Sequence, residues 1–199
     1  MAYSTISKPS LHFNTKLYTG NGGTNALTGV GFQPDLTWIK ERGATGDHFW
    51  CDAVRGVTKY ILSNAAGAEG TNANTLTAFG TDGFTLGSDG WTNNNSDTYA
   101  SWNFKANGAG SANTDGSINS TVSVNTTAGF SIVKYTGNAT VSTIGHGLGV
   151  APKMIITKNL SATGDWYTYH EFIGNTKVML LNTDSAASGA DIGFWNNTS

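Results

Sequence analysis

Short runs in which apolar or aromatic residues alternate with polar ones recur along the chain. In the first half these runs are TKLYT (15–19), DLTWIKE (35–41), HFWCDAV (48–54), KYILSN (59–64), FTLG (84–87) and YASWNFKA (99–106). A period of two residues is typical of strands, and the separating segments GNGG, QPD, TGD, TDG and SDG are turn signals. In YASWNFKA the residues Ala100, Trp102 and Phe104 share one face, which is the alternation of a strand buried on one side.

The chain also repeats itself. FNTKLYTGN (13–21) aligns with FSIVKYTGN (130–138) at an offset of 117 residues. At an offset of 118, GVGFQPDLTWIKERGATGD (29–47) aligns with GLGVAPKMIITKNLSATGD (147–165), and KYILSN (59–64) aligns with KVMLLN (177–182). Matches in one order with a single shift indicate two copies of one structural unit. The second copy lacks a counterpart of residues 82–106, so either another chain completes it or the sequence is a fragment of a longer protein. We favour the fragment.

These patterns predict an all-β fold of two tandem antiparallel β-sandwich modules, jelly-roll or lectin-like in kind, with the second module incomplete. The expected boundaries are an N-terminal arm at 1–12, a first sandwich at 13–106, a connector rich in Gly, Ser, Thr and Asn at 107–129, and a second repeat at 130–199 that lacks its closing strands. Within the connector, the alternating segment STVSVN (120–125) can add an edge strand.

The tetrapeptide ATGD occurs twice, at 44–47 and 162–165, each time before an aromatic run. We interpret both copies as turns between strands. Gly46 and Gly164 are expected to supply a positive φ, and Asp47 and Asp165 are expected to accept hydrogen bonds from nearby backbone amides. The turn then occurs twice because the whole unit is duplicated, and it does not mark two active sites.

Composition narrows the classes of protein. Gly, Ser, Thr and Asn account for 26, 17, 28 and 20 residues, together 91 of 199, and this mixture disfavours helices. A net charge of −2 gives no basic surface for nucleic acid, and no apolar stretch predicts a membrane span or a secretory signal. The single cysteine, Cys51, is expected to be a small buried side chain and not a nucleophile.

Catalytic and metal-binding signatures are not evident. The four histidines show no metal-ligand spacing, and neither a nucleophile elbow nor a phosphate-binding loop is present. No cofactor or metal is therefore predicted. A polysaccharide hydrolase would need a facing pair of carboxylates, and none of the available ones pairs convincingly. These candidates are Glu41, Asp47, Asp52, Glu69 and Glu171.

A carbohydrate platform is the most credible small-molecule site. GSDGWTNNNSD (87–97) places Trp91 beside Asn93, Asn94 and Asn95, and sugars favour an aromatic face next to amide side chains. The alternative is that Trp91 folds back and caps the sandwich.

Several motifs together resemble a repeat domain of tail-associated structural proteins of bacteriophages, common in phages of marine bacteria and cyanobacteria. They are HFNTKLYTGNGG, GVGFQPDLTWIK, DGFTLGSD, NTDGSINSTVSVNTTAGFSIVKYTGN and GHGLGVAPKMIITKN followed by DWYTYH. The resemblance covers residues 1–198 and carries no catalytic residue. It implies a virion component, a tail fibre or another appendage, made in the host cytoplasm and packaged in the particle. By analogy with phage fibres it also implies a homotrimer, in which weak glycan contacts multiply through avidity.

Three hypotheses follow for the function. The first is a non-enzymatic virion structural protein that binds itself and other virion proteins and contacts host surface glycans, with no nucleic acid and no membrane insertion. The second is a lectin-like carbohydrate-binding module, and the third is an enzyme that degrades surface polysaccharide.

Overall fold

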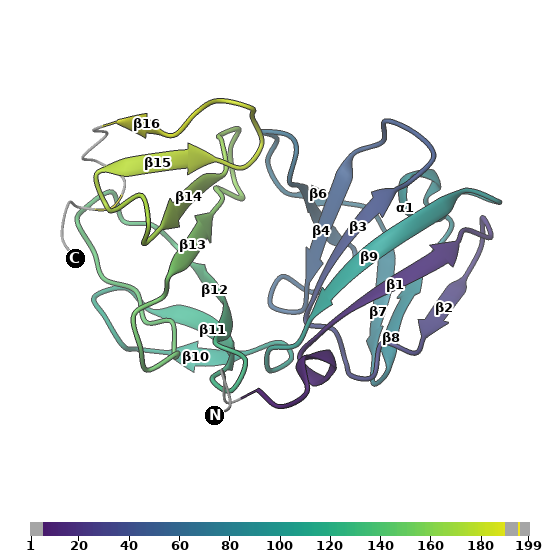
Figure 1. Cartoon of the computed structure of the whole chain (residues 1–199), viewed down its shortest axis with the longest axis horizontal. Coiled ribbons are helices and arrows are strands. Elements are labelled where there is room, and N and C mark those ends of the chain that lie inside the picture. Colours follow the sequence, from purple (N-terminus) through teal and green to yellow (C-terminus); the bar gives the residue numbers. More distant parts are fainter. Residues whose placement is uncertain (1–5, 190–194, 196–199) are drawn as a thin grey trace.

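The chain is almost entirely β-structure, and every strand pair is antiparallel (Figure 1). This computed structural model describes residues 6–189 and Trp195. Residues 1–5 of the predicted arm, and 190–194 and 196–199 of the predicted second repeat, lie outside the described residues. The all-β sandwich expected from the alternation is confirmed. Helix is limited, in the described part, to the 3₁₀ turn η1 (Pro9–Leu11) and the short helix α1 (Gly90–Asn93).

The first half of the chain forms a sandwich of two sheets. The larger sheet has the strand order β1 (Phe13–Thr19), β9 (Thr98–Phe104), β3 (Leu36–Glu41), β4 (His48–Asp52), β5 (Lys59–Leu62) and β6 (Gly70–Thr71). The smaller sheet has the order β2 (Asn25–Thr28), β8 (Gly83–Leu86) and β7 (Leu76–Gly80). β9 is the last strand of this half in sequence and lies between β1 and β3. The large sheet is therefore completed only after the strands of the small sheet have been formed along the chain.

The main apolar core lies between these two sheets. The large sheet supplies Tyr18, Ile39, Phe49, Cys51 and Tyr99, and the small sheet supplies Leu27, Leu76, Phe84 and Leu86. The Tyr18 and Tyr99 rings stack with centroids 5.0 Å apart. Each strand contributes alternate residues to this layer, as a pleated strand with one buried face requires.

The more deeply buried face of β9 is not the one predicted from the sequence. Tyr99, Ser101 and Asn103 are fully buried, whereas Ala100, Trp102 and Phe104 are only half-buried. The expectation of a single apolar buried face is therefore wrong for this strand. The inner face tolerates polar groups because the Asn103 side-chain amide donates to Ser101 Oγ (3.0 Å) and to the backbone carbonyl of Asn14 (3.2 Å). On the opposite face, Phe104 stacks on Phe130 of the second half with ring centroids 5.3 Å apart.

The second half contains two further sheets. One has the order β10 (Ser111–Asn113), β11 (Ser120–Asn125) and β12 (Phe130–Tyr135), and the other has the order β13 (Met154–Thr157), β14 (Tyr167–His170), β15 (Lys177–Leu180) and β16 (Ser188–Gly189). The segment 107–129, predicted as a connector, thus carries two strands. Strand β11 is the central strand of its sheet and not an edge, because β10 and β12 pair with it on either side.

Strand pairing in the second half matches the first at the offset of 118 residues. Met154 pairs with His170 as Leu36 pairs with Asp52. The pairs Tyr167–Leu180 and Lys177–Gly189 correspond in the same way to Phe49–Leu62 and Lys59–Thr71. The sequence similarity between the two halves therefore coincides with identical register over β13, β14, β15 and β16.

Both ATGD segments are loops between paired strands, as predicted, but their chemistry differs from the expectation. Gly46 and Gly164 are absent from the glycines with positive φ. Asp47 accepts a hydrogen bond from the side chain of Asn64, and Asp165 accepts one from the side chain of Asn182, both at 2.8 Å. The aspartates therefore bond a side-chain amide and not the backbone. The bond links the loop before β4 to Asn64 after β5, and the loop before β14 to Asn182 after β15.

Trp166 joins the two halves. Its side chain is 2 % exposed, and its indole N–H donates to the carbonyls of Leu62 (3.0 Å) and Ala65 (3.1 Å). Its ring lies 5.2 Å from that of Trp50 on the large sheet. Backbone hydrogen bonds from Glu69 to Leu160 and from Gly164 to Ala66, each 2.9 Å, reinforce the same junction.

Replacing Trp166 with alanine should destabilise the protein by about 3–5 kcal/mol, because a large buried ring and two hydrogen-bonded carbonyls lose their partner. Trp91→Ala is the matched control. That ring is 58 % exposed, and its removal should change stability by less than about 0.5 kcal/mol. Urea unfolding followed by circular dichroism measures both, and equal effects of the two variants would contradict the role given to Trp166.

Cys51 should resist alkylation in the folded protein. It is 1 % exposed, and loss of hydration raises its pKa to about 12, so almost no thiolate is present at pH 8. Iodoacetamide should label it at least about a hundredfold more slowly than in 6 M guanidinium, as measured by intact mass. Equal rates in the two conditions would show that the thiol is accessible in the folded state.

Candidate functional site: a cleft between the two halves

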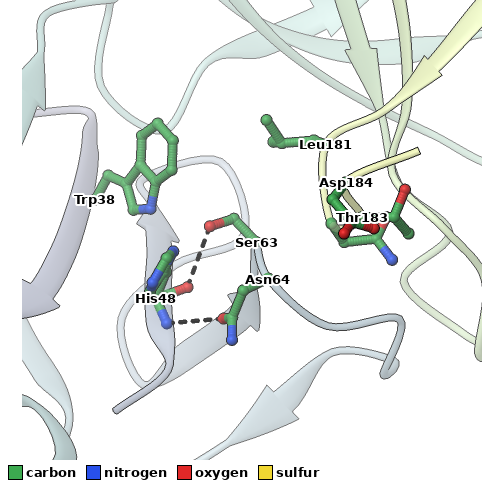
Figure 2. A pocket seen from close by; sticks show the side chains of 8 residues that line it. Trp38, His48, Ser63, Asn64, Leu181, Thr183 and Asp184 are labelled. Carbon is green, nitrogen blue, oxygen red and sulfur yellow. Dashed lines mark hydrogen bonds between the residues drawn. The ribbon is translucent and has the colours of Figure 1, made fainter. Parts of the chain in front are cut away.

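A cleft of about 630 Å³ opens where the two halves face each other. From the first half it is lined by Trp38 of β3, His48 of β4, and Ser63 and Asn64 after β5. From the second half it is lined by residues 181–184, which follow β15 (Figure 2). At the offset of 118 the two loops correspond, so Asn64 and Asn182 face the cleft from opposite halves.

A row of indole rings runs from the large sheet to this cleft. Trp38 pairs directly with Trp102 of β9 on one side and with Trp50 of β4 on the other. The ring centroids are 5.8 and 5.3 Å apart, and Trp166 continues the row beyond Trp50. We call Trp102, Trp38 and Trp50 the tryptophan row. All three are half-buried, so each retains some accessible surface outside the main core.

The polar groups beside the tryptophan row are held in place by internal bonds. Asn64 accepts the backbone N–H of His48 (2.9 Å) and donates to Asp47, which fixes its amide plane. The Ser63 hydroxyl contacts the backbone carbonyl of His48 at 3.5 Å (Figure 2). The Trp38 indole N–H is shielded and has no hydrogen-bond partner within the described residues. An unpaired buried donor is unusual, and this one lies in a cleft-lining side chain.

The cleft carries little charge. Loss of hydration lowers the pKa of His48, Lys40 lowers it further, and Asp47 opposes the shift. The imidazole is therefore uncharged at neutral pH. Of the other lining residues only Asp184 carries a charge. Neutral amide, hydroxyl and imidazole groups beside an indole suit an uncharged hydroxylated ligand better than a phosphate or another anion.

Ser63, His48 and Asp184 line one cleft but do not form a hydrogen-bonded catalytic triad. The serine hydroxyl contacts the histidine backbone and not its ring. Within the part of the chain that the structure describes, no hydrogen bond joins the His48 ring to Ser63 or Asp184. A nucleophile and a base would need to be within hydrogen-bond reach of each other.

Most carboxylates considered from the sequence take part in internal bonds. Asp52 and Glu69 both contact the guanidinium of Arg55, at 2.5 and 3.4 Å. Glu171 pairs with Lys153 at 2.7 Å on the surface. Asp47 bonds Asn64, as described above. None of these five candidates lines the cleft.

The segment that the sequence singled out lies apart from the cleft. Trp91 lies in α1 and is 58 % exposed, so the interpretation that it caps the sandwich is wrong. Asn94 and Asn95 are exposed beside it, and Asn94 also donates to Asp97 (2.6 Å).

Asn93, by contrast, is fully buried. Its amide donates to the carbonyls of Gly23 (2.7 Å) and Gly87 (2.8 Å) and to the side chain of Asn21 (3.0 Å). It therefore cannot reach a ligand on the surface, and a glycan contact there would depend on Trp91, Asn94 and Asn95.

The tryptophan row was not identified from the sequence. The signal was nevertheless present: LTWIKE, HFWCD and YASWNF each carry one Trp inside a strand. What the sequence does not state is that these three strands are adjacent and in a register that brings the rings together.

No group of three or more His, Cys, Asp or Glu residues that could hold a metal ion is found in residues 6–189 and 195. Over the same residues, no helix has the length and apolar character needed to cross a membrane.

The lowered pKa of His48 predicts a specific pH dependence. The unfolded chain keeps a histidine pKa near 6.5 and so binds more protons than the folded chain as the pH falls through that value. The stability linked to His48 is therefore complete above pH 6.5 and is lost toward the lower pKa of the folded state. His48→Gln should lose less stability than the wild type between pH 8 and pH 5 in urea titrations. An NMR titration that places the His48 midpoint at or above 6.5 would contradict this.

Comparisons with known proteins give the family. No curated protein and no solved structure matches the chain. Residues 8–199, nearly the full length, match the family described as Domain of unknown function (DUF7483), and the chain therefore belongs to that family.

Proposed function

We propose that the chain is a non-enzymatic structural module of a phage tail fibre or a related virion appendage, and that its cleft contacts glycans on the host surface. The observation that carries the glycan contact is the tryptophan row beside neutral, pre-positioned amide and hydroxyl groups.

The chemistry of such a surface fits sugars. An indole offers a broad apolar face with a hydrogen-bond donor at its edge, and pyranose rings present apolar C–H faces ringed by hydroxyls. At Trp38 the indole N–H has no partner within the described residues but is shielded, so a ligand could accept from it only after a shift of the ring or of its neighbours. Asn64 is locked by bonds to Asp47 and His48, so ordering its side chain would cost little entropy on binding.

The virion role rests on different support. The chain resembles tail-associated repeat domains, and its two halves share strand registers at a constant offset, as expected of a protein built from repeated units. Individual contacts with sugars are weak, and an appendage that presents many copies multiplies them through avidity. On this proposal the partners are other copies of the chain, by analogy in a trimer, and further virion proteins.

A free-standing carbohydrate-binding module is the second candidate. It is favoured by the exposure of Trp91 next to Asn94 and Asn95, which gives a glycan a second surface away from the cleft. The two candidates differ in which tryptophan matters and in the assembly state of the protein.

A glycan array probed with the wild type, Trp38→Ala and Trp91→Ala tests both candidates. On the main proposal, Trp38→Ala lowers binding at least tenfold and Trp91→Ala changes it less than twofold. The reverse order favours the second candidate. Circular dichroism shows whether each variant remains folded.

Two further measurements accompany the array. Light scattering at several concentrations should show an oligomer for an appendage protein, whereas a monomer would favour a free-standing module. Release of new reducing ends from bound polysaccharide would contradict a non-enzymatic role.

A further inference from the structure

β12 and β13 are each a terminal strand of a sheet in the second half, as β10 and β16 are. β12 is the last strand of the order β10-β11-β12, and β13 is the first strand of the order β13-β14-β15-β16. Among the described residues, β12 and β13 do not pair with each other. An open edge presents a row of unpaired N–H and C=O groups, which is a template for another strand.

In the first half, the strands that correspond to β12 and β13 have another strand paired between them. β12 corresponds to β1 at the offset of 117, and β13 corresponds to β3 at the offset of 118. Between β1 and β3 lies β9, which pairs with β1 from Phe104 to Thr98 and with β3 from Phe104 to Tyr99. The described second half therefore has both flanking strands and no strand between them.

The loop before β13 shares two features with its counterpart before β3. Gly29 and Gly31 have positive φ, and so do Gly147 and Gly149. Asn14 of β1 and Ser131 of β12 stand at matching positions, and each side chain donates a hydrogen bond to a carbonyl of this loop. The acceptors differ, because Asn14 bonds Val30 (2.9 Å) whereas Ser131 bonds His146 (2.7 Å), the counterpart of Thr28. β1 and β12 are thus each tied to the corresponding loop, through carbonyls that are not equivalent.

Apolar side chains on β13 and in the loop before it are exposed where their counterparts are buried. Met154 of β13 is 50 % exposed, whereas its counterpart Leu36 of β3 is 2 % exposed. Val150 is 70 % exposed, whereas its counterpart Phe32 is 4 % exposed. Apolar residues at these positions match a buried environment, and the described residues do not supply it.

We propose that the edges of β12 and β13 form an acceptor for one extended strand with the chemistry of β9, antiparallel to both. This strand carries small polar and tyrosine side chains on the face that packs inward, as Tyr99, Ser101 and Asn103 do, and aromatic residues on the other face. It contributes backbone hydrogen bonds on both sides and covers Met154.

The donor is a segment that belongs to no sheet of its own molecule. Insertion between β12 and β13 requires a strand with both edges free. Every strand described here is already paired on at least one side, and β9 is paired on both. An intact second copy of residues 6–189 therefore cannot supply it, and the partner is an unpaired polypeptide segment of the stated pattern.

A synthetic peptide of residues 97–106, DTYASWNFKA, tests the proposal on the full 199-residue chain. It should slow amide hydrogen exchange in β12 and β13 at least tenfold and leave β1 and β3 unchanged. Oxidation of Met154 by dilute peroxide should slow at least fivefold. The matched control peptide carries Ser101→Pro, which removes a backbone donor and breaks the strand, and it should bind at least tenfold more weakly.

A covalent version keeps the test independent of peptide solubility. Residues 82–106 appended after Ser199 through a flexible linker should protect Met154 and the amides of β12 and β13 as the peptide does, and the Ser101→Pro version of the fusion should not. Absence of protection from both peptide and fusion would overturn the proposal, as would equal protection by the proline peptide. Protection of Met154 that rises with chain concentration alone would assign the edges to self-association and overturn it too.

Discussion

The arrangement of the whole chain depends on the burial of one indole at the junction of its halves. Trp166 is enclosed by the second half's own loop, by the ring of Trp50 and by the carbonyls of Leu62 and Ala65. Because its N–H donates to the carbonyls of Leu62, the last residue of β5, and of Ala65 in the turn that follows, the contact has a direction as well as an area. Backbone hydrogen bonds from Glu69 to Leu160 and from Gly164 to Ala66 hold the same junction, and the loops on either side of it line the cleft. Without this junction, Trp38 would lie on an exposed sheet face and would not line a cleft.

The second constraint is the use of β9 on both faces. Toward the small sheet it presents Tyr99, Ser101 and Asn103, and the polar members are accommodated through hydrogen bonds inside the layer. Toward the second half it presents Trp102 and Phe104, and Phe104 stacks on Phe130 of β12 with centroids 5.3 Å apart. A strand with two occupied faces cannot show a simple apolar and polar alternation, because neither face is solvent. The half-buried Trp102 on this face belongs to the tryptophan row beside the candidate site.

Sequence patterns located the strands that carry bulky residues. The runs around β1, β3, β4, β5, β8 and β9 were predicted, and their turns were in the expected places. β2, β7 and β10 were missed because NALT, LTAFG and SAN are short and poor in aromatic residues, so the local signal does not separate them from loops. Positive φ at Gly46 and Gly164 was wrongly expected, because a loop with an Asp–Asn side-chain bond needs no left-handed residue.

The cleft could not be predicted from local sequence patterns. Its lining comes from segments 118 residues apart, and only their equivalence was visible in the sequence. Trp91 was singled out because it stands in a polar loop, whereas Trp38 and Trp102 were hidden within strands. Where two halves meet, the partners of a side chain are set by long-range contacts, and strand alternation says only which face a residue occupies.

The junction at Trp166 also has a polarity. The second half contributes the indole, and the first half contributes the carbonyls at the end of β5 that receive it. At the position that corresponds to Trp166, the first half has His48, which lines the cleft and inserts into no other unit. The contact is therefore heterologous: one unit uses one surface as donor and its neighbour uses a different surface as receptor. When such a contact is repeated, each added unit is turned and shifted by the same amount as the last, and the units form a ring if the rotation closes and an open helical array if it does not. A polypeptide that continued this junction from unit to unit without closing a ring would extend as a helical array with distinguishable ends.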